Sequence, residues 1–229
     1  MRCLLCAAQF HQTLSVQTIL KLGPIMRPTV CSSCLDRFVP INHQNACPSC
    51  QRYQEKRTVC QDCQFWQAKY PGESFRHHAL FYYDDQMQQF FQDYKARGDF
   101  RLATVFSSVI NDFFRHHQFD TYCCLPPDLQ RLANRGFDHV KALFSSLETL
   151  DLLQKRQSSQ PQAQKNRQQR LATPQIYSFS GDYRCLKHPR SILLLDDIYT
   201  TGRTLTHARM CLREAGFKGK IVTFSLVRA

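Results

Sequence analysis

The chain has 229 residues, of which 43% are hydrophobic and 21% are charged, and its formal net charge is +12. This length and composition suit one substantial core, or one core with a small appended module, and exclude a collagen-like, mucin-like or wholly disordered chain. No apolar run is long enough to span a bilayer, and the N-terminus has no signal-peptide core, so we expect a soluble, cytoplasmic protein. The excess of basic residues favours polyanionic partners such as nucleic acid.

The first part of the chain is rich in cysteine. Eight of the twelve cysteines form four consecutive Cys-x2-Cys pairs, and in a protein that is not exported such pairs indicate metal binding rather than disulfides. Each pair offers two thiolates at one tight turn, so four pairs predict two closed, structural zinc sites. Redox-active dithiols and unconnected buried cysteines are the alternatives, although no βαβ pattern, as a redox motif would require, surrounds the pairs. The predicted ligands are Cys3, Cys6, Cys31, Cys34, Cys47, Cys50, Cys60 and Cys63.

The spacing of these pairs leaves their grouping open. We favour a double zinc ribbon in which the first four cysteines bind one ion and the last four bind the other, but a cross-braced arrangement with alternating pairs has the same spacing. So small a module has little apolar core, and the metal should supply much of its folding free energy. The turn signal Tyr70-Pro71-Gly72 predicts a boundary, with the ribbon module over residues 1–66 and a second domain over 67–229.

The second domain alternates between strand and helix patterns, which predicts an α/β fold with a mostly parallel sheet. Apolar runs without alternation are typical of strands that are buried on both faces. Helical spacing and a terminal glycine, Gly216, predict a helix near the C-terminus. We expect strands over 75–83, 121–125, 192–195 and 221–227, and helices over 84–95, 101–114, 138–153 and 205–215.

One segment of this domain has a different composition. Residues 154–170 contain seven glutamines and five basic residues, with no acidic residue. Such a segment cannot bury enough apolar surface to offset its ordering entropy, so we expect a mobile basic loop at about 154–175. Lys165, Arg167 and Arg170 in this loop are candidates for contact with a diphosphate or with a nucleic-acid backbone, and a solubilising disordered loop is the alternative interpretation.

The most informative motif is ILLLDDIYTTGRT, at residues 192–204. Its apolar strand brings Asp196 and Asp197 to the carboxyl end of a parallel sheet, where ligands bind in such folds. The loop from Thr200 to Thr204 opens into a helix, whose free N–H groups favour an anion, and Gly202 allows a phosphate to approach the backbone. Two carboxylates near a phosphate site suit a phosphorylated ribose, whereas an acidic turn that merely caps the helix is the simpler alternative.

This motif resembles the signature of type I phosphoribosyltransferases, which bind 5-phosphoribosyl-1-diphosphate (PRPP). The resemblance implies that Asp196 and Asp197 bind the ribose hydroxyls, that the following loop binds the 5′-phosphate, and that Mg²⁺ accompanies PRPP. The PRPP-binding residues carried over in this way are Asp196, Asp197, Ile198, Tyr199, Thr200, Thr201, Gly202, Arg203 and Thr204.

The whole chain resembles the ComF family of late-competence DNA-uptake proteins, which join a cysteine-rich zinc module to a phosphoribosyltransferase-like domain. The matching features are the cysteine pairs, DYKARGD at 93–99, LPPDLQRLANRGFDH at 125–139, the PRPP signature and the ending LVRA. One departure is Arg170, which stands where the family tends to have an asparagine three residues after Arg167. The resemblance implies association with single-stranded DNA and with a DNA-translocating competence helicase.

The remaining candidates carry weaker signals. Arg131 and Arg135 follow a predicted strand at the place of a diphosphate-binding loop, and a solvated basic helix start is equally compatible with them. The pairs His77-His78 and His116-His117 should be surface or interface histidines, because adjacent side chains diverge and cannot chelate one ion. We expect Cys123, Cys124 and Cys211 to be small buried hydrophobic residues.

Three hypotheses for the function follow. In the first, the protein handles incoming single-stranded DNA during natural transformation and carries a PRPP-binding domain. In the second, it is an active phosphoribosyltransferase, for which the sequence offers a donor site but no recognisable acceptor pocket or general base. In the third, it is a non-catalytic zinc-ribbon protein that senses PRPP and binds nucleic acid.

Overall fold

The computed structural model describes the chain except for residues 13–19, 21–26, 157–174 and 183–188. Its centre is a four-stranded sheet in the order β1-β6-β5-β2, in which all three strand pairs are parallel. Because the two central strands are covered on both faces, most of their residues are buried. The strands are β1 (His77–Tyr82), β2 (Thr121–Cys124), β5 (Ser191–Tyr199) and β6 (Lys220–Arg228). The predicted α/β class with a parallel sheet is confirmed.

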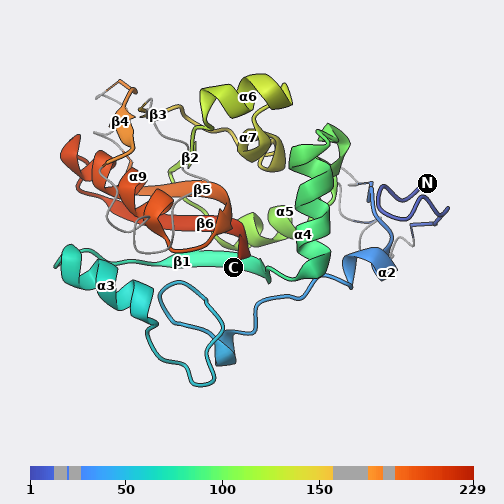
Figure 1. Ribbon diagram of the computed structural model, residues 1–229, viewed down its shortest axis with the longest axis horizontal. Helices are drawn as coiled ribbons and strands as arrows, with labels where there is room; N and C mark the ends of the chain where they lie inside the picture. Colours follow the sequence, from blue (N-terminus) through green and yellow to red (C-terminus); the bar gives the residue numbers. More distant parts are fainter. Residues whose placement is uncertain (13–19, 21–26, 157–174, 183–188) are drawn as a thin grey trace.

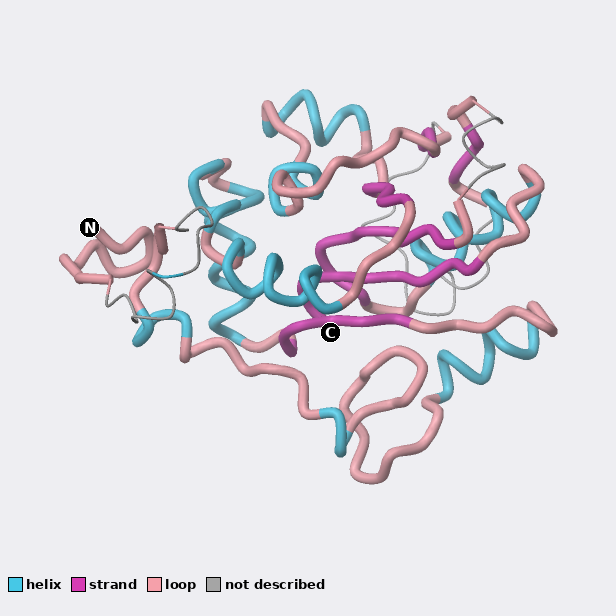
Figure 2. The backbone as a smooth tube through the Cα atoms, turned by 180° about the vertical axis from the view of Figure 1, so that it is seen from behind, coloured by secondary structure: helices cyan, strands magenta, loops and turns pink. Residues whose placement is uncertain are grey.

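Successive residues of β5 enter two different cores, as the twofold alternation of a strand requires. Leu193 and Leu195 pack with the aromatic cluster of the preceding helices, whereas Ile192 and Leu194 pack against the C-terminal helix. Figure 2 shows helices on both sides of the strands. The first face is covered by α4 (Asp85–Phe91), α5 (Ser107–His116) and α7 (His139–Leu143), and the second by α9 (Arg203–Glu214).

The cysteine-rich segment is divided between these two cores. Cys3 and Cys34 pack into the core on the α4 and α5 side, beside Phe38, whereas the later four cysteines pack into the core on the α9 side. In Figure 1 the N-terminus and α2 (Ser32–Leu35) accordingly lie next to α4, while α3 (Gln61–Lys69) lies below β1. The two groups of cysteines are therefore attached to opposite faces of the same sheet.

Several expected helices are shorter or more irregular than the spacing predicts. The helix expected over 138–153 is wrong beyond Leu143, because the chain leaves α7 and forms β3 (Leu153–Lys155), which pairs with β4 (Tyr177–Phe179) in an antiparallel ribbon. The helix expected over 84–95 changes after α4 to a π-helical turn, Gln92–Ala96. The one expected over 101–114 is a 3₁₀ turn, Phe100–Thr104, followed by α5.

Other elements complete the part of the chain that the structure describes. A 3₁₀ turn spans His43–Asn45, and α6 (Leu129–Arg135) follows β2. The basic loop expected at about 154–175 begins within β3, and residues 157–174, with Lys165, Arg167 and Arg170, lie outside the described residues. Among the described helices, none has the length and apolar character needed to cross a membrane.

Candidate functional site

The cysteines form two separate groups of four. In each group the Sγ atoms lie within 4.8 Å of one another, and the groups are Cys3, Cys6, Cys31 and Cys34, and Cys47, Cys50, Cys60 and Cys63. The sequential grouping is therefore confirmed and the cross-braced alternative is excluded. All four cysteines of the second group are buried, whereas Cys6 in the first group is exposed.

The surroundings of both groups fit a metal ion bound by thiolates. Backbone N–H groups point at sulfur: Cys31 donates to Cys3 Sγ at 3.4 Å, and Cys60 donates to Cys47 Sγ at 3.3 Å. Such bonds stabilise the negative charge that a thiolate ligand carries. Four sulfur ligands leave no open position, which is the donor set of a structural zinc site rather than a catalytic one. Each group could thus hold one metal ion.

The second cysteine group is tied to the sheet by Arg228, at the end of β6. This side chain is 1% exposed, and its Nε donates to Cys50 O at 3.0 Å while its Nη1 donates to Tyr199 O at 3.0 Å. The guanidinium also lies over the Tyr199 ring, 4.7 Å from its centroid. Arg228 therefore fixes the carboxyl end of β5 relative to the second cysteine group.

A second link joins this cysteine group to the threonine-rich loop after β5. Trp66 lies in α3, which begins directly after Cys60, and its Nε1 donates to Thr201 O at 2.8 Å. The indole is 1% exposed. Because Thr201 lies within the predicted phosphate loop, this hydrogen bond attaches α3 to that loop.

The two predicted carboxylates lie inside β5 rather than after its end. β5 continues beside β6 as far as Tyr199, whereas its other neighbour, β2, stops opposite Leu195. Asp196 and Asp197 therefore sit where one flank of β5 has lost its partner strand. Asp197 is buried and Asp196 is half-buried, so the pair lies at the carboxyl edge of the sheet as expected, but recessed.

Two basic side chains that the motif did not indicate contact Asp197. Lys95 Nζ forms an ion pair with Asp197 Oδ2, and His139 Nε2 lies 3.0 Å from the same oxygen. Tyr94 Oη donates to the His139 carbonyl at 2.6 Å, which joins the π turn to α7. Lys95 stands on this π turn, and its ammonium lies 4.3 Å from the centroid of the Phe91 ring. π turns are frequent at functional sites, but they have no readable sequence pattern.

The charges of the two carboxylates are set by these neighbours. Burial alone would raise the pKa of Asp197, but Lys95 and His139 together hold that pKa well below its usual value. Burial, and then the negative charge of Asp197, raise the pKa of Asp196 well above its usual value. Asp197 is therefore the carboxylate that stays ionised, and Asp196 is the one that readily keeps a proton.

The loop over 200–204 leads directly into the N-terminus of α9. Gly202 is the N-cap of α9 with φ 75°, and no side chain caps this end of the helix. A Cβ at Gly202 would overlap Tyr199 Oη, so this position requires glycine for space as well as for its backbone conformation. Thr200 is exposed, whereas Thr201 is buried and Thr204 is half-buried. The N-terminus of the twelve-residue α9 thus lies directly after the acidic pair.

The structure separates the remaining basic candidates. Arg131 is exposed on α6, whereas Arg135 is half-buried, and its Nε donates to Lys95 O at 3.1 Å. Burial lowers the pKa of Arg135, and the charge of Asp197 opposes that shift. Lys155 in β3 lies 3.9 Å from Asp128 and within electrostatic range of Asp196 and Arg203. Arg135 and Lys155 therefore lie near the acidic pair.

The other sequence expectations had mixed outcomes. Cys123, Cys124 and Cys211 are buried as expected. The expectation for His77 was wrong: this ring is 4% exposed, with Nδ1 2.9 Å from Thr223 Oγ1 and Nε2 3.1 Å from Ser225 Oγ. Adjacent strand residues face opposite sides, so His77 packs in the interior beside β6, while the half-buried His78 faces the Phe113 ring of α5.

Known proteins match this chain over its full length. No family model matches the chain. It is 38% identical over 230 residues to competence protein ComFC of Streptococcus pneumoniae (strain ATCC BAA-255 / R6), with both chains covered completely. The chain belongs to the ComFC family of competence proteins. It is also 29% identical over 235 residues to competence protein ComFC of Bacillus subtilis (strain 168), covering 99% of this chain and 95% of that protein.

Membership of the ComFC family confirms the resemblance inferred from the sequence. The shared region covers both cysteine groups, the π turn with Lys95, α7 with His139 and the motif of β5 and α9. The chain is therefore a competence protein with a parallel α/β domain and two groups of four cysteines.

Proposed function

We propose that this ComFC-family protein handles incoming single-stranded DNA in the cytoplasm and carries a binding site for PRPP. The observation that supports the PRPP site is the recessed carboxylate pair of β5, followed directly by the glycine-capped N-terminus of α9. A ribose diol needs hydrogen-bond acceptors and its 5′-phosphate needs donors, and these two kinds of group follow each other here along one stretch of backbone.

Each part of the site would have a separate task. The 5′-phosphate would accept hydrogen bonds from the loop over 200–204, and the ribose hydroxyls would donate to Asp196 and Asp197. Because Lys95 and His139 already contact Asp197, a diol must displace or share these contacts. A bound Mg²⁺ would offset the negative charge of the diphosphate and favour the ionised form of Asp196. Arg131, Arg135 and Lys155 are the nearby cations for the diphosphate.

Zinc is the metal that we assign to the two cysteine groups. Four thiolates in a closed site favour zinc, and such thiolates persist in a reducing compartment such as the cytoplasm. The ions would act in folding rather than in catalysis, because every ligand position is taken by the protein. The net charge of +12 supports binding to single-stranded DNA. We also propose a DNA-translocating competence helicase as the protein partner.

One cavity favours phosphoribosyl transfer as a second candidate function. It has a volume of about 300 Å³ and lies between the residues that follow β2, α6 and β3. Its lining combines Pro126, Pro127 and Leu132 with Lys155, which also interacts electrostatically with Asp196. An acceptor nitrogen bound there would form a bond to ribose C1 as the bond from C1 to the diphosphate oxygen breaks, releasing diphosphate.

Calorimetry with Mg²⁺ and PRPP tests the proposed site. We expect the wild-type protein to bind with a dissociation constant in the micromolar range, and Asp196→Asn/Asp197→Asn to bind at least about 100-fold more weakly, which corresponds to about 2.7 kcal/mol. The matched control is Asp36→Asn/Asp85→Asn, which removes two exposed carboxylates elsewhere. Equal binding by the acidic-pair variant and the control would refute the site. Diphosphate release with a panel of bases separates transfer from binding alone.

A further inference from the structure

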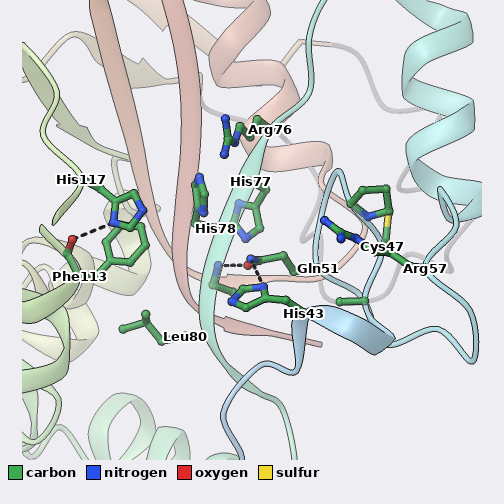
Figure 3. A pocket seen from close by; sticks show the side chains of 13 residues that line it. His43, Cys47, Gln51, Arg57, Arg76, His77, His78, Leu80, Phe113 and His117 are labelled. Carbon is green, nitrogen blue, oxygen red and sulfur yellow. Dashed lines mark hydrogen bonds between the residues drawn. The ribbon is translucent and has the colours of Figure 1, made fainter.

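A second polar cavity lies at the opposite edge of the sheet from β2. It has a volume of about 350 Å³ and opens along the outer edge of β1, as Figure 3 shows. A cavity of this size can accept a nucleotide-sized group. It is lined by His43, Ala46, Cys47, Pro48, Gln51, Arg57, Arg76, His77, His78, Ala79, Leu80, Phe113 and His117.

Three separate parts of the chain supply the cavity with basic groups. Arg76 directly precedes β1, and His78 stands two residues further, so both belong to the same side of the extended backbone. His117 comes from the end of α5. His43 precedes the second cysteine group, and Arg57 lies within it, between Cys50 and Cys60.

The cavity carries no acidic residue to balance these groups. Its lining includes two arginines and four histidines and lacks both aspartate and glutamate. The environment of His78 reflects the same imbalance: burial lowers its pKa to about 4, and the charges that lower it further belong to Arg76, His117, His43 and Lys220. A site with excess donors and positive potential favours an anion.

The wall of the cavity is held in place by Gln51. This residue follows the Cys47–Cys50 pair with φ 61° and is 8% exposed. Its Oε1 accepts a hydrogen bond from the backbone N–H of Ala79 in β1, and its Nε2 lies 3.2 Å from His43 Nδ1 (Figure 3). Gln51 thus attaches the cysteine loop to the edge of β1 and positions His43 beside that edge. These hydrogen bonds fix the shape of this wall of the cavity.

Aromatic rings form the other wall. The rings of Phe113 and His117 stack at 4.2 Å with an interplanar angle of 11°, and His78 lies 5.5 Å from Phe113. His117 Nδ1 is 3.0 Å from the Phe113 carbonyl, which orients the ring, and His117 is exposed. Flat rings beside basic side chains are the elements with which proteins bind unpaired nucleotides.

We propose that this cavity binds a phosphate group of a nucleotide, either free or within a single strand of nucleic acid. Arg57 and Arg76 would bind the phosphate oxygens, because a guanidinium offers paired donors that match them. His117 would stack on the neighbouring base. An acidic peptide would satisfy the charges but not the stacked rings, so the nucleotide is the better match. The inference rests on the proposed DNA-handling function only where it names single-stranded DNA as the nucleic acid, and it does not depend on the PRPP site.

Binding of a 15-residue oligothymidylate to the full-length, zinc-loaded protein tests this assignment. In Arg57→Gln/Arg76→Gln, we expect affinity about tenfold weaker in moderate salt. The slope of log K against log salt should fall by about 1.4, since each phosphate contact contributes about 0.7 on single strands. Both arginines are exposed, so the variant should fold. The control Arg37→Gln/Arg101→Gln removes two exposed arginines outside the cavity and should retain the affinity and slope.

Carbon-edited NMR spectra of labelled histidine rings locate the binding. At pH 7 the oligonucleotide should move the ring signals of His78 and His117, assigned with His78→Gln and His117→Gln, whereas PRPP should move His139. Equal movement with thymidine 5′-phosphate would identify a free nucleotide as the ligand, and movement with the oligonucleotide alone would identify a strand. Three results would overturn the proposal. The His78 and His117 signals could stay in place with every phosphate probe, or they could move with polyglutamate alone. The affinity for the oligonucleotide could also fall equally in the cavity variant and in the control variant. Failure of PRPP to move His139 would count only against the first site.

Discussion

At the scale of single residues, the most informative group is the buried contact between Asp197 and Lys95. The carboxylate would be costly to bury alone, and the ammonium together with His139 makes its ionised form stable. The same contact occupies the oxygen that we assign to a ribose hydroxyl. On the proposed function, a ribose hydroxyl would therefore compete with Lys95 for Asp197.

Replacement of Lys95 tests this balance. We expect Lys95→Met to lower the free energy of unfolding by about 2 kcal/mol at pH 8, because it leaves Asp197 buried without its main counter-charge. Without Lys95, burial raises the pKa of Asp197. A raised pKa of Asp197 stabilises the fold at low pH, where the carboxyl is protonated, and this contribution is lost as the proton leaves. The difference in unfolding free energy between wild type and Lys95→Met should therefore grow between pH 5.5 and pH 8. Urea unfolding at several pH values measures this trend.

Two further variants control for side effects of the Lys95 substitution. Lys141→Met breaks an exposed pair with Asp151 and should change the free energy of unfolding by less than about 0.5 kcal/mol. Lys95→Met/Asp197→Asn removes both charges and should recover much of the lost stability. A deficit of Lys95→Met that stays constant with pH, or a double variant as unstable as the single one, would contradict this role of Lys95.

At the scale of elements, the second cysteine group supports the loop after β5. α3 begins after Cys60 and contacts the loop through Trp66, while Arg228 links Cys50 to Tyr199. The first cysteine group has no such connection among the described contacts and packs instead with the core beside α4 and α5. The two cysteine groups should therefore have different effects on the proposed PRPP site.

The single tryptophan of the chain reports on this connection. We expect Cys60→Ser to release one equivalent of zinc, to shift the fluorescence of Trp66 towards that of exposed indole, and to weaken PRPP binding. Cys6→Ser, in the exposed corner of the first group, should also release one equivalent but leave the Trp66 emission unchanged. Metal analysis, emission spectra and calorimetry provide the comparison. Identical spectral changes in the two variants would show that α3 does not couple the second group to the loop.

At the scale of the whole molecule, one sheet joins four features that the sequence presents separately. The cysteine groups lie on its two faces, the acidic pair lies where β2 ends, and the cavity lined by Arg57 and Arg76 lies along β1 (Figures 1 and 3). The proposed PRPP site thus lies at the carboxyl end of the central strand β5, whereas the other proposed site lies along the outer edge of β1. A strand bound at β1 would leave the PRPP site open, so we expect the two ligands to bind independently.

The sequence predicted those parts of the molecule that depend on local pattern. The four cysteine pairs identified the metal ligands because the ligand spacing is fixed within each pair, and the apolar runs of β5 and β6 identified the parallel sheet. The contacts of Lys95 and His139 with Asp197 were missed because the two residues come from elements 102 and 58 residues away. Both residues lie in stretches that support the family resemblance, DYKARGD and LPPDLQRLANRGFDH, but those stretches alone do not assign them a partner. The helix expected over 138–153 failed because pairing of β3 with β4 overrides helical spacing.

The most direct test of the central claim is a crystal structure of the protein with Mg²⁺ and PRPP. The proposed PRPP site requires the 5′-phosphate on the backbone amides of the loop over 200–204, the ribose hydroxyls on Asp196 and Asp197, and Lys95 Nζ moved away from Asp197 Oδ2. PRPP bound elsewhere at saturating concentration, with the contact between Lys95 and Asp197 unchanged, would contradict it.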